Sequence, residues 1–231
     1  MEDHGQKAGY NLKDVILGGQ DGLVNVLGVI LAVAIATSDA KIVIIAGLAA
    51  TFAESISMAA VAYTSSKAMK DFYRSQMSKE IKEIEETPDV ERKEIRDIYF
   101  AKGFRGHLLA AIVRKITGDK KLWLKTMIEE EMHLDPEEYK NPGRDAAIVG
   151  FSSLIGSFIP LLPFFAFSVS QAVYASVLLS ALVLFLTGAI KGRITTGSWI
   201  RSGIEITLIG MAAALIGYAI GALLGVSIYA A

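Results

Sequence analysis

The sequence contains no cysteine. This absence excludes disulfide bonds, thiolate metal sites and iron–sulfur clusters in one step. Histidine is almost as scarce, with three in the chain, and His133 forms the single E-x-x-H pattern together with Glu130. A ferritin-like di-iron site requires two such motifs, so a di-iron ferroxidase remains only an alternative interpretation.

The chain also has little net charge, −1, and very little charge within its apolar segments. Just over half of its residues are hydrophobic, 52%, which is too apolar for a typical soluble domain. Five segments reach the roughly 20 apolar residues that a spanning helix needs. They are Val15–Thr37, Ile42–Tyr63, Ala146–Phe167, Val173–Ile190 and Ile204–Ala230. We therefore expect an integral, multi-pass membrane protein whose first span is retained rather than cleaved.

Lysine and arginine are missing from one side of these spans. The N-terminal segment, the polar stretch Lys67–Arg144 and the loop after Ile190 carry many basic residues, whereas the opposite connections have almost none. Basic residues favour the cytoplasmic side. This asymmetry predicts a cytoplasmic N-terminus, a cytoplasmic polar insert and a C-terminus on the other side.

The first two spans carry ionisable and amide side chains despite their apolar surroundings. Asp21 and Asn25 lie in the first span, and Glu54 and Met58 lie in the second. Because the two spans are antiparallel and joined by a short loop, we expect these residues to lie at similar depths and to share one face. Carboxylates inside spans usually mark transport paths. A thioether beside carboxylate and amide oxygens favours a divalent transition metal over Mg²⁺ or Ca²⁺.

The polar insert is predicted to be helical. Its first helix continues the second span from Lys67 to Glu86, a second runs from Pro88 to about Lys102, and a third covers Lys120–Leu134. Acidic residues occur three apart on the first two helices, and Met127 is followed by an acidic residue four positions later. Such converging carboxylates are how helical bundles hold iron or manganese. The predicted metal ligands are Glu80, Glu83, Glu91, Glu94, Met127 and Glu131.

The predicted fold is therefore an all-α membrane protein with five transmembrane helices and a cytoplasmic three-helix metal-binding insert between the second and third. Residues 1–66 form the N-terminal segment with the first two spans, 67–144 form the insert, and 145–231 form the last three spans.

Four motifs in this order resemble those of the vacuolar iron transporter family, in its prokaryotic type. They are D-G-L-V at 21–24, S-I-S-M at 55–58, I-P-L-L-P at 159–163 and K-G-R at 191–193. The resemblance implies a homodimeric secondary transporter, not an enzyme, that exchanges Fe²⁺ for protons. It also implies that Asp21 and Met58 line the translocation path and that the six insert ligands gather metal. One departure is Ile128, which follows Met127 where the family often has a second methionine.

The leading hypothesis is proton-coupled export of a divalent transition metal, preferably Fe²⁺, from the cytoplasm. The membrane would be the cell membrane in a prokaryote and the vacuolar membrane in a eukaryote. Export of Mn²⁺ or a broader set including Zn²⁺ and Co²⁺ is a first alternative, and a membrane-bound ferroxidase or iron-storage protein is a second. We expect no tightly bound cofactor and no nucleic-acid partner. The expected partners are the lipid bilayer, a second copy of the chain, metal ions and protons.

Overall fold

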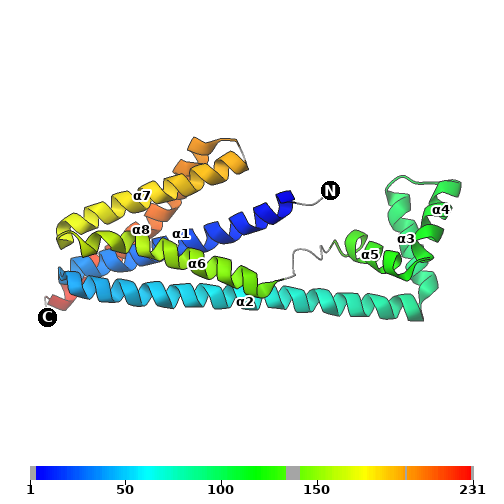
Figure 1. The fold of residues 1–231 in the computed structure, drawn as a ribbon, viewed down its shortest axis with the longest axis horizontal. Coiled ribbons are helices and arrows are strands. Elements are labelled where there is room, and N and C mark those ends of the chain that lie inside the picture. The colour runs from blue at the N-terminus through cyan, green and yellow to red at the C-terminus, as the bar shows by residue number, and fades with distance from the viewer. Residues whose placement is uncertain (1–3, 134–140, 196, 230–231) are drawn as a thin grey trace. The chain divides into compact units, whose positions relative to one another are not determined.

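The computed structural model describes residues 4–133, 141–195 and 197–229, and the side chains of 12–133, 141–195 and 197–223. This part of the chain is helical and has no β-strand (Figure 1). The helices are α1 (His4–Thr37), α2 (Ala40–Glu86), α3 (Pro88–Ala101), α4 (Gly106–Thr117), α5 (Lys120–Glu130), α6 (Pro142–Leu161), the 3-10 helix η1 (Leu162–Phe165), α7 (Val169–Ile194) and α8 (Trp199–Tyr229).

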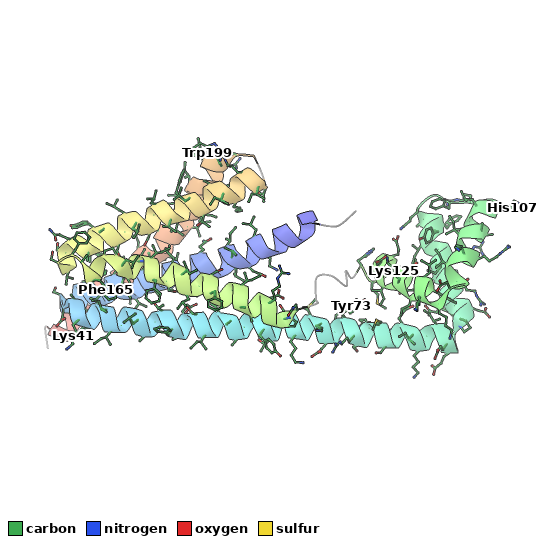
Figure 2. The ribbon with its side chains drawn as sticks, viewed as in Figure 1. Lys41, Tyr73, His107, Lys125, Phe165 and Trp199 are labelled. Atoms are coloured by element: carbon green, nitrogen blue, oxygen red, sulfur yellow. The ribbon has the colours of Figure 1, made fainter. Side chains whose placement is uncertain are left out.

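Five of these helices are long and apolar enough to cross a membrane: α1, α2, α6 with η1, α7 and α8. They carry the five spans predicted from the sequence, although the predicted end at Ala230 lies outside the described residues. Many large apolar side chains on these helices are exposed and point outward (Figure 2). The outer surface of these helices therefore suits contact with lipid.

The chain divides into two compact units. The first comprises Met1–Tyr63 and Gly143–Ala231, and the second comprises Thr64–Pro142. Helix α2 has 47 residues, or about 70 Å at 1.5 Å per residue, which is more than twice the length a bilayer core requires. Its apolar first part belongs to the first unit, and its charged second part, from Thr64 onward, belongs to the second.

In the first unit, close contacts at glycines hold the spanning helices together. On α1, Gly18 faces the backbone of Val149 on α6, while Gly28 faces Gly217 on α8. Small residues permit this approach of helix backbones inside a membrane. Gly156 of α6 likewise lies directly against α1. The glycines of the first span are thus used within the chain.

The turn between α1 and α2 is short and capped. Ser38 adopts a left-handed conformation with φ of 51°, which reverses the chain. The Asp39 carboxylate then accepts hydrogen bonds from the backbone N–H groups of Lys41, at 2.8 Å, and Ile42. These bonds satisfy two of the free donors at the start of α2. Because the turn reverses the chain, α1 and α2 run antiparallel.

The second unit contains one helix more than the sequence predicted. Helix α4 occupies Gly106–Thr117, where the sequence predicted no helix, so the prediction of three insert helices was wrong. Gly106 is the first residue of α4 rather than a break, and its φ of 56° suits glycine. The apolar spacing of Leu109, Ile112 and Ile116 marks one face of this helix.

An apolar core organises the second unit. Ile84, Ile95, Ile116, Trp123 and Met127 are buried together, one or more from each of its helices. At the edge of this core an ion pair of 3.2 Å joins Lys120 to Glu85. Pro88 opens α3, as the sequence predicted, and the Thr87 hydroxyl before it donates to the Glu83 carbonyl rather than capping α3.

Replacement of Gly156 with alanine should destabilise the first unit. The new Cβ would lie 2.1 Å from the Gly19 carbonyl oxygen, which is backbone and cannot move aside alone. We expect a loss of about 1–3 kcal/mol, typical of overpacking, measured as a lower melting temperature of the chain in detergent. Gly28→Ala is the matched control, because its Cβ would meet its nearest neighbour at 3.9 Å. Equal melting temperatures for both variants would contradict this packing.

Candidate functional site

Three polar side chains gather between α1 and α2 in the first unit. The Asn25 amide donates to the Asp21 carboxylate at 3.3 Å. The Glu54 carboxyl of α2 lies within hydrogen-bonding reach of both. The structure therefore brings together three of the four residues predicted for the membrane path. Met58 lies one helical turn beyond Glu54 and is half-buried.

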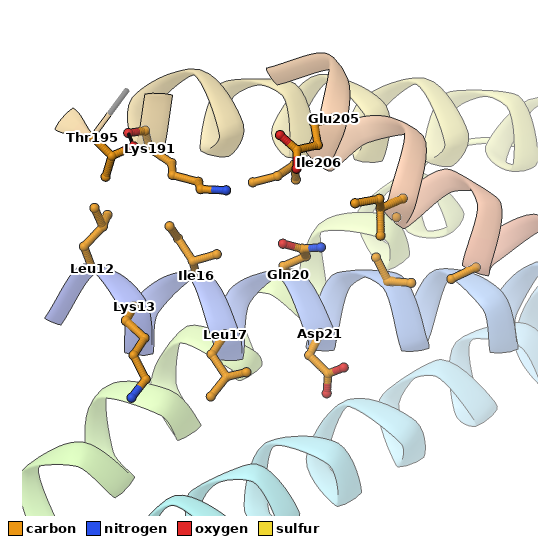
Figure 3. A pocket seen from close by; sticks show the side chains of 14 residues that line it. Leu12, Lys13, Ile16, Leu17, Gln20, Asp21, Lys191, Thr195, Glu205 and Ile206 are labelled. Atoms are coloured by element: carbon orange, nitrogen blue, oxygen red, sulfur yellow. Dashed lines mark hydrogen bonds between the residues drawn. The ribbon is translucent and has the colours of Figure 1, made fainter. Parts of the chain in front are cut away.

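A cavity of about 680 Å³ lies between α1, α7 and α8, and Asp21 lines it. Figure 3 shows that the Asp21 side chain is nevertheless directed away from α8 and toward α2. Gln20, Lys191 and Glu205 supply polar groups elsewhere in the lining. The Asp21 carboxylate therefore belongs to the polar group it forms with Glu54 and Asn25.

Sequence reasoning missed a set of buried hydroxyls in the same unit. Ser153 and Ser157 of α6 face Gly22 of α1, next to Asp21, and Thr51 of α2 is one turn from Glu54. All three hydroxyl oxygens are buried and have no hydrogen-bond partner among the described residues. Serines spaced four apart in an apolar span were the available signal, because they place two hydroxyls on one helix face.

A second acidic group lies in the insert. Glu80 of α2, Glu91 of α3 and Glu131, which follows α5, each place a carboxylate oxygen within 4.8 Å of the others. Glu80 and Glu91 are buried, and each has one oxygen without a hydrogen-bond partner in the described part of the chain. Each of the three residues comes from a different segment. Such a set can surround a cation.

Burial and mutual repulsion disfavour ionisation of these carboxyls. Burial, followed by the charge of Glu91, raises the pKa of Glu80 to about 8. Burial also raises the pKa of Glu91. The pKa of Glu131 is raised by burial and then by the charges of Glu94, Glu91 and Glu83. A divalent cation at this point would offset the repulsion and favour the ionised forms.

The remaining predicted insert ligands have different surroundings. Glu83 and Glu94 are half-buried and close enough to act electrostatically on the other carboxyls, and Glu83 also pairs with Lys79 at 3.4 Å. Met127 is fully buried in the apolar core of the insert.

The E-x-x-H pattern has no part in this cluster. Glu130 forms an ion pair with Lys102, and His133 is exposed. The group of acidic ligands within 4.8 Å contains neither residue. The structure thus adds nothing in favour of a di-iron centre.

Residues 12–222 match the sequence profile of the VIT family. The chain belongs to this family. Vacuolar iron transporter 1 of Oryza sativa subsp. japonica is 31% identical over 212 residues, which is 91% of the chain and 84% of that protein. Vacuolar iron transporter 1 of Arabidopsis thaliana is 30% identical, covering 91% of the chain and 86% of that protein.

Two further relatives match over most of the chain. The vacuolar iron transporter of Plasmodium falciparum (isolate 3D7) is 29% identical over 97% of the chain and 87% of that protein. Protein CCC1 of Saccharomyces cerevisiae is 26% identical over 88% of the chain and 66% of that protein. These matches confirm the resemblance drawn from the sequence motifs. Together with the five apolar helices, they identify the chain as an integral, multi-pass membrane protein.

The stability of the insert should depend on pH and on divalent cations. A carboxyl whose pKa is higher in the folded chain than in the unfolded one favours folding when protonated. The contribution of Glu80 is therefore lost as pH rises from its ordinary pKa of 4.5 to about 8. Thermal unfolding of a Trp199→Phe chain in detergent, followed through the buried Trp123, should show a melting temperature that falls over this range without metal. Added Mn²⁺ should restore it, more strongly at pH 8 than at pH 6.

Two variants test that the Glu80 carboxyl is responsible. Glu80→Gln should remove most of the pH-dependent fall and also the stabilisation by Mn²⁺. Glu129→Gln is the control, because Glu129 is exposed and pairs with Lys125 at 3.7 Å, outside the acidic cluster. A Glu80→Gln chain that Mn²⁺ still stabilises as much as the wild type would contradict the cluster as a metal site.

Proposed function

We propose that this protein is a secondary transporter that exports a divalent transition metal, preferably Fe²⁺, from the cytoplasm in exchange for protons. The observation that carries the proposal is the pair of carboxylates, Asp21 and Glu54, held together between two apolar spanning helices. Placing a carboxylate within a membrane span costs free energy, and such residues are usually functional. The relatives named as iron transporters support iron as the cargo.

The insert would capture the metal first. Glu80, Glu91 and Glu131 would supply the inner ligands, with Glu83 and Glu94 adding negative charge around them. Because metal replaces protons on these carboxyls, capture would be tighter at higher pH. Met127 would act as a ligand only if its sulfur left the apolar core.

The membrane step would use the α1–α2 polar group. Asp21, Glu54 and Asn25 offer carboxylate and amide oxygens, and Met58 would add a softer thioether ligand that favours transition metals. Protons that arrive at these carboxylates would compete with the metal for the same oxygens and so release it. This exchange is the proposed basis of proton coupling. The buried hydroxyls of Ser153, Ser157 and Thr51 would offer further oxygen ligands inside the bundle.

We propose that two copies of the chain assemble through α1 and α2. In a single chain, Asn25 is exposed and Asp21 is only half-buried, although both lie within a span. Exposure of these groups to lipid would be costly. A second copy would cover them and complete the path at the dimer interface. The N-terminus and the insert would lie on the cytoplasmic side, as the distribution of basic residues favours.

Manganese export remains the alternative within transport, and transport assays with several metals distinguish the two. A ferroxidase is the alternative of another class. It would require oxygen, whereas transport would continue without it.

Asp21→Asn should abolish transport. The substitution keeps the side-chain volume but removes the charge that would bind the cation and later accept a proton. The measurement is Fe²⁺ movement in vesicles containing the reconstituted protein, under an imposed pH gradient and without oxygen, and we expect a fall of at least tenfold. Stabilisation of the insert by Mn²⁺ should stay unchanged in this variant.

Asp71→Asn is the matched control for this experiment. Asp71 is exposed on the charged part of α2 and pairs with Lys67 at 2.9 Å, so the variant should transport at the wild-type rate. Transport at the wild-type rate by Asp21→Asn would eliminate the proposed membrane step.

The proposed dimer predicts efficient cross-linking at Asn25. Because the chain has no cysteine, Asn25→Cys introduces a single thiol. In membranes, a short bis-maleimide should convert most of this variant into a species of twice the chain mass. Leu178→Cys places a thiol on α7 at a residue that is 72% exposed and should remain monomeric. Equal cross-linking of both variants would mean that α1 does not form the interface.

A further inference from the structure

A groove between α3 and α4 gathers positive charge away from the acidic cluster. Its cavity has a volume of about 520 Å³, and four arginines line it: Arg92, Arg96, Arg105 and Arg114. No acidic side chain is part of this lining among the described residues. The volume is in the range of small-molecule sites.

Helical spacing places these arginines on the groove. On α3, Arg92, Arg96 and Phe100 are successive positions four apart, so they share one face. On α4, Ala110 and Arg114 are four positions apart and share one face, and Leu109 also lines the cavity. Like charges spaced four apart repel each other, so this arrangement opposes folding unless something offsets it.

The protein itself neutralises only part of this charge. Arg92 pairs with the exposed Asp89 at 2.9 Å. Arg105 lies 3.5 Å from the centre of the Phe100 ring and donates to the Phe104 carbonyl at 2.8 Å. No ion pair joins Arg96 or Arg114 to an acidic side chain in the described part of the chain. Two guanidinium groups are thus available to a ligand.

The chemistry of the lining indicates the kind of ligand. Guanidinium groups bind phosphate oxygens through paired N–H donors. Gly106 also lines the cavity, where the start of α4 has no side-chain cap and so presents free backbone N–H groups. Phe100, Leu109 and Val113 provide an apolar wall. His107 is exposed and points away from the insert (Figure 2).

We infer that the α3–α4 groove is a binding site for a phosphate ester, with the phosphate held by Arg96 and Arg114 and the organic part against the apolar wall. This ligand is either a soluble phosphate ester or the headgroup of a phosphorylated lipid. Binding would offset the repulsion among the arginines. The inference is independent of the transport mechanism, and a failed Asp21 experiment would leave it unaffected.

Calorimetry on the full chain in detergent, in buffer freed of divalent cations, tests this site with three probes. They are inorganic pyrophosphate, ADP and a short-chain dioctanoyl phosphatidylinositol 4-phosphate. We expect one molecule of ADP per chain, bound more tightly than pyrophosphate because of the apolar wall. Binding of the lipid alone would instead assign the site to a membrane headgroup. Binding of none of the three would overturn the inference.

Matched variants assign the binding to the groove. The double variant Arg96→Gln with Arg114→Gln should weaken binding at least tenfold. The control, Arg74→Gln with Lys115→Gln, removes the same charge outside the groove and should change affinity less than twofold. Ala110→Trp keeps all four arginines but fills the cavity, and it should also prevent binding.

Stabilisation by Mn²⁺ reports separately whether each of these variants retains a folded insert. Binding that survives both the double arginine substitution and Ala110→Trp would overturn the assignment to this groove.

Discussion

Glu80 and Glu91 each bury a carboxylate oxygen that has no hydrogen-bond partner in the described part of the chain, and Glu131 lies beside them. Placing like charges together away from water costs free energy. The insert tolerates this because apolar residues from all of its helices form one core, in which Ile95 and Met127 are fully buried. The core holds the three acidic segments in place, and burial first, then repulsion between the carboxylates, raises the pKa of Glu80 and of Glu131. A bound cation would offset this repulsion. The unfavourable placement of the three carboxylates and the proposed metal binding therefore have the same physical cause.

In the membrane unit, packing between apolar helices also holds two carboxylates close together. There, Asp21 and Glu54 approach each other on helices that are otherwise apolar. Close packing at glycines fixes α1 against α6 and α8, so Asp21 has a defined position beside α2. Buried hydroxyls on α6 extend the polar surface within the bundle. In both the membrane unit and the insert, apolar packing between helices therefore fixes the positions of the carboxylates.

Helix α3 separates two opposite electrostatic environments. Its buried face carries Glu91 and Ile95, whereas Arg92 and Arg96 lie on the face that lines the groove with α4. A helix of 14 residues can do this because its side chains repeat every 3.6 residues. A cation site and an anion site can thus share one short element without neutralising each other.

The sequence by itself determined the membrane class, the five spans, the family and the identity of most acidic candidates, because apolar length and helical spacing are local properties. It missed α4, since two glycines near its start resembled a break. Only the tertiary structure decided which carboxylates meet. Glu80, Glu91 and Glu131 come from three segments, and their approach depends on the core between them. The tertiary structure also decided that Glu130 forms an ion pair with Lys102 and that Met127 lies in the apolar core. It brings four arginines together in the groove between α3 and α4. Contacts between distant helices are set by packing, which no single segment encodes.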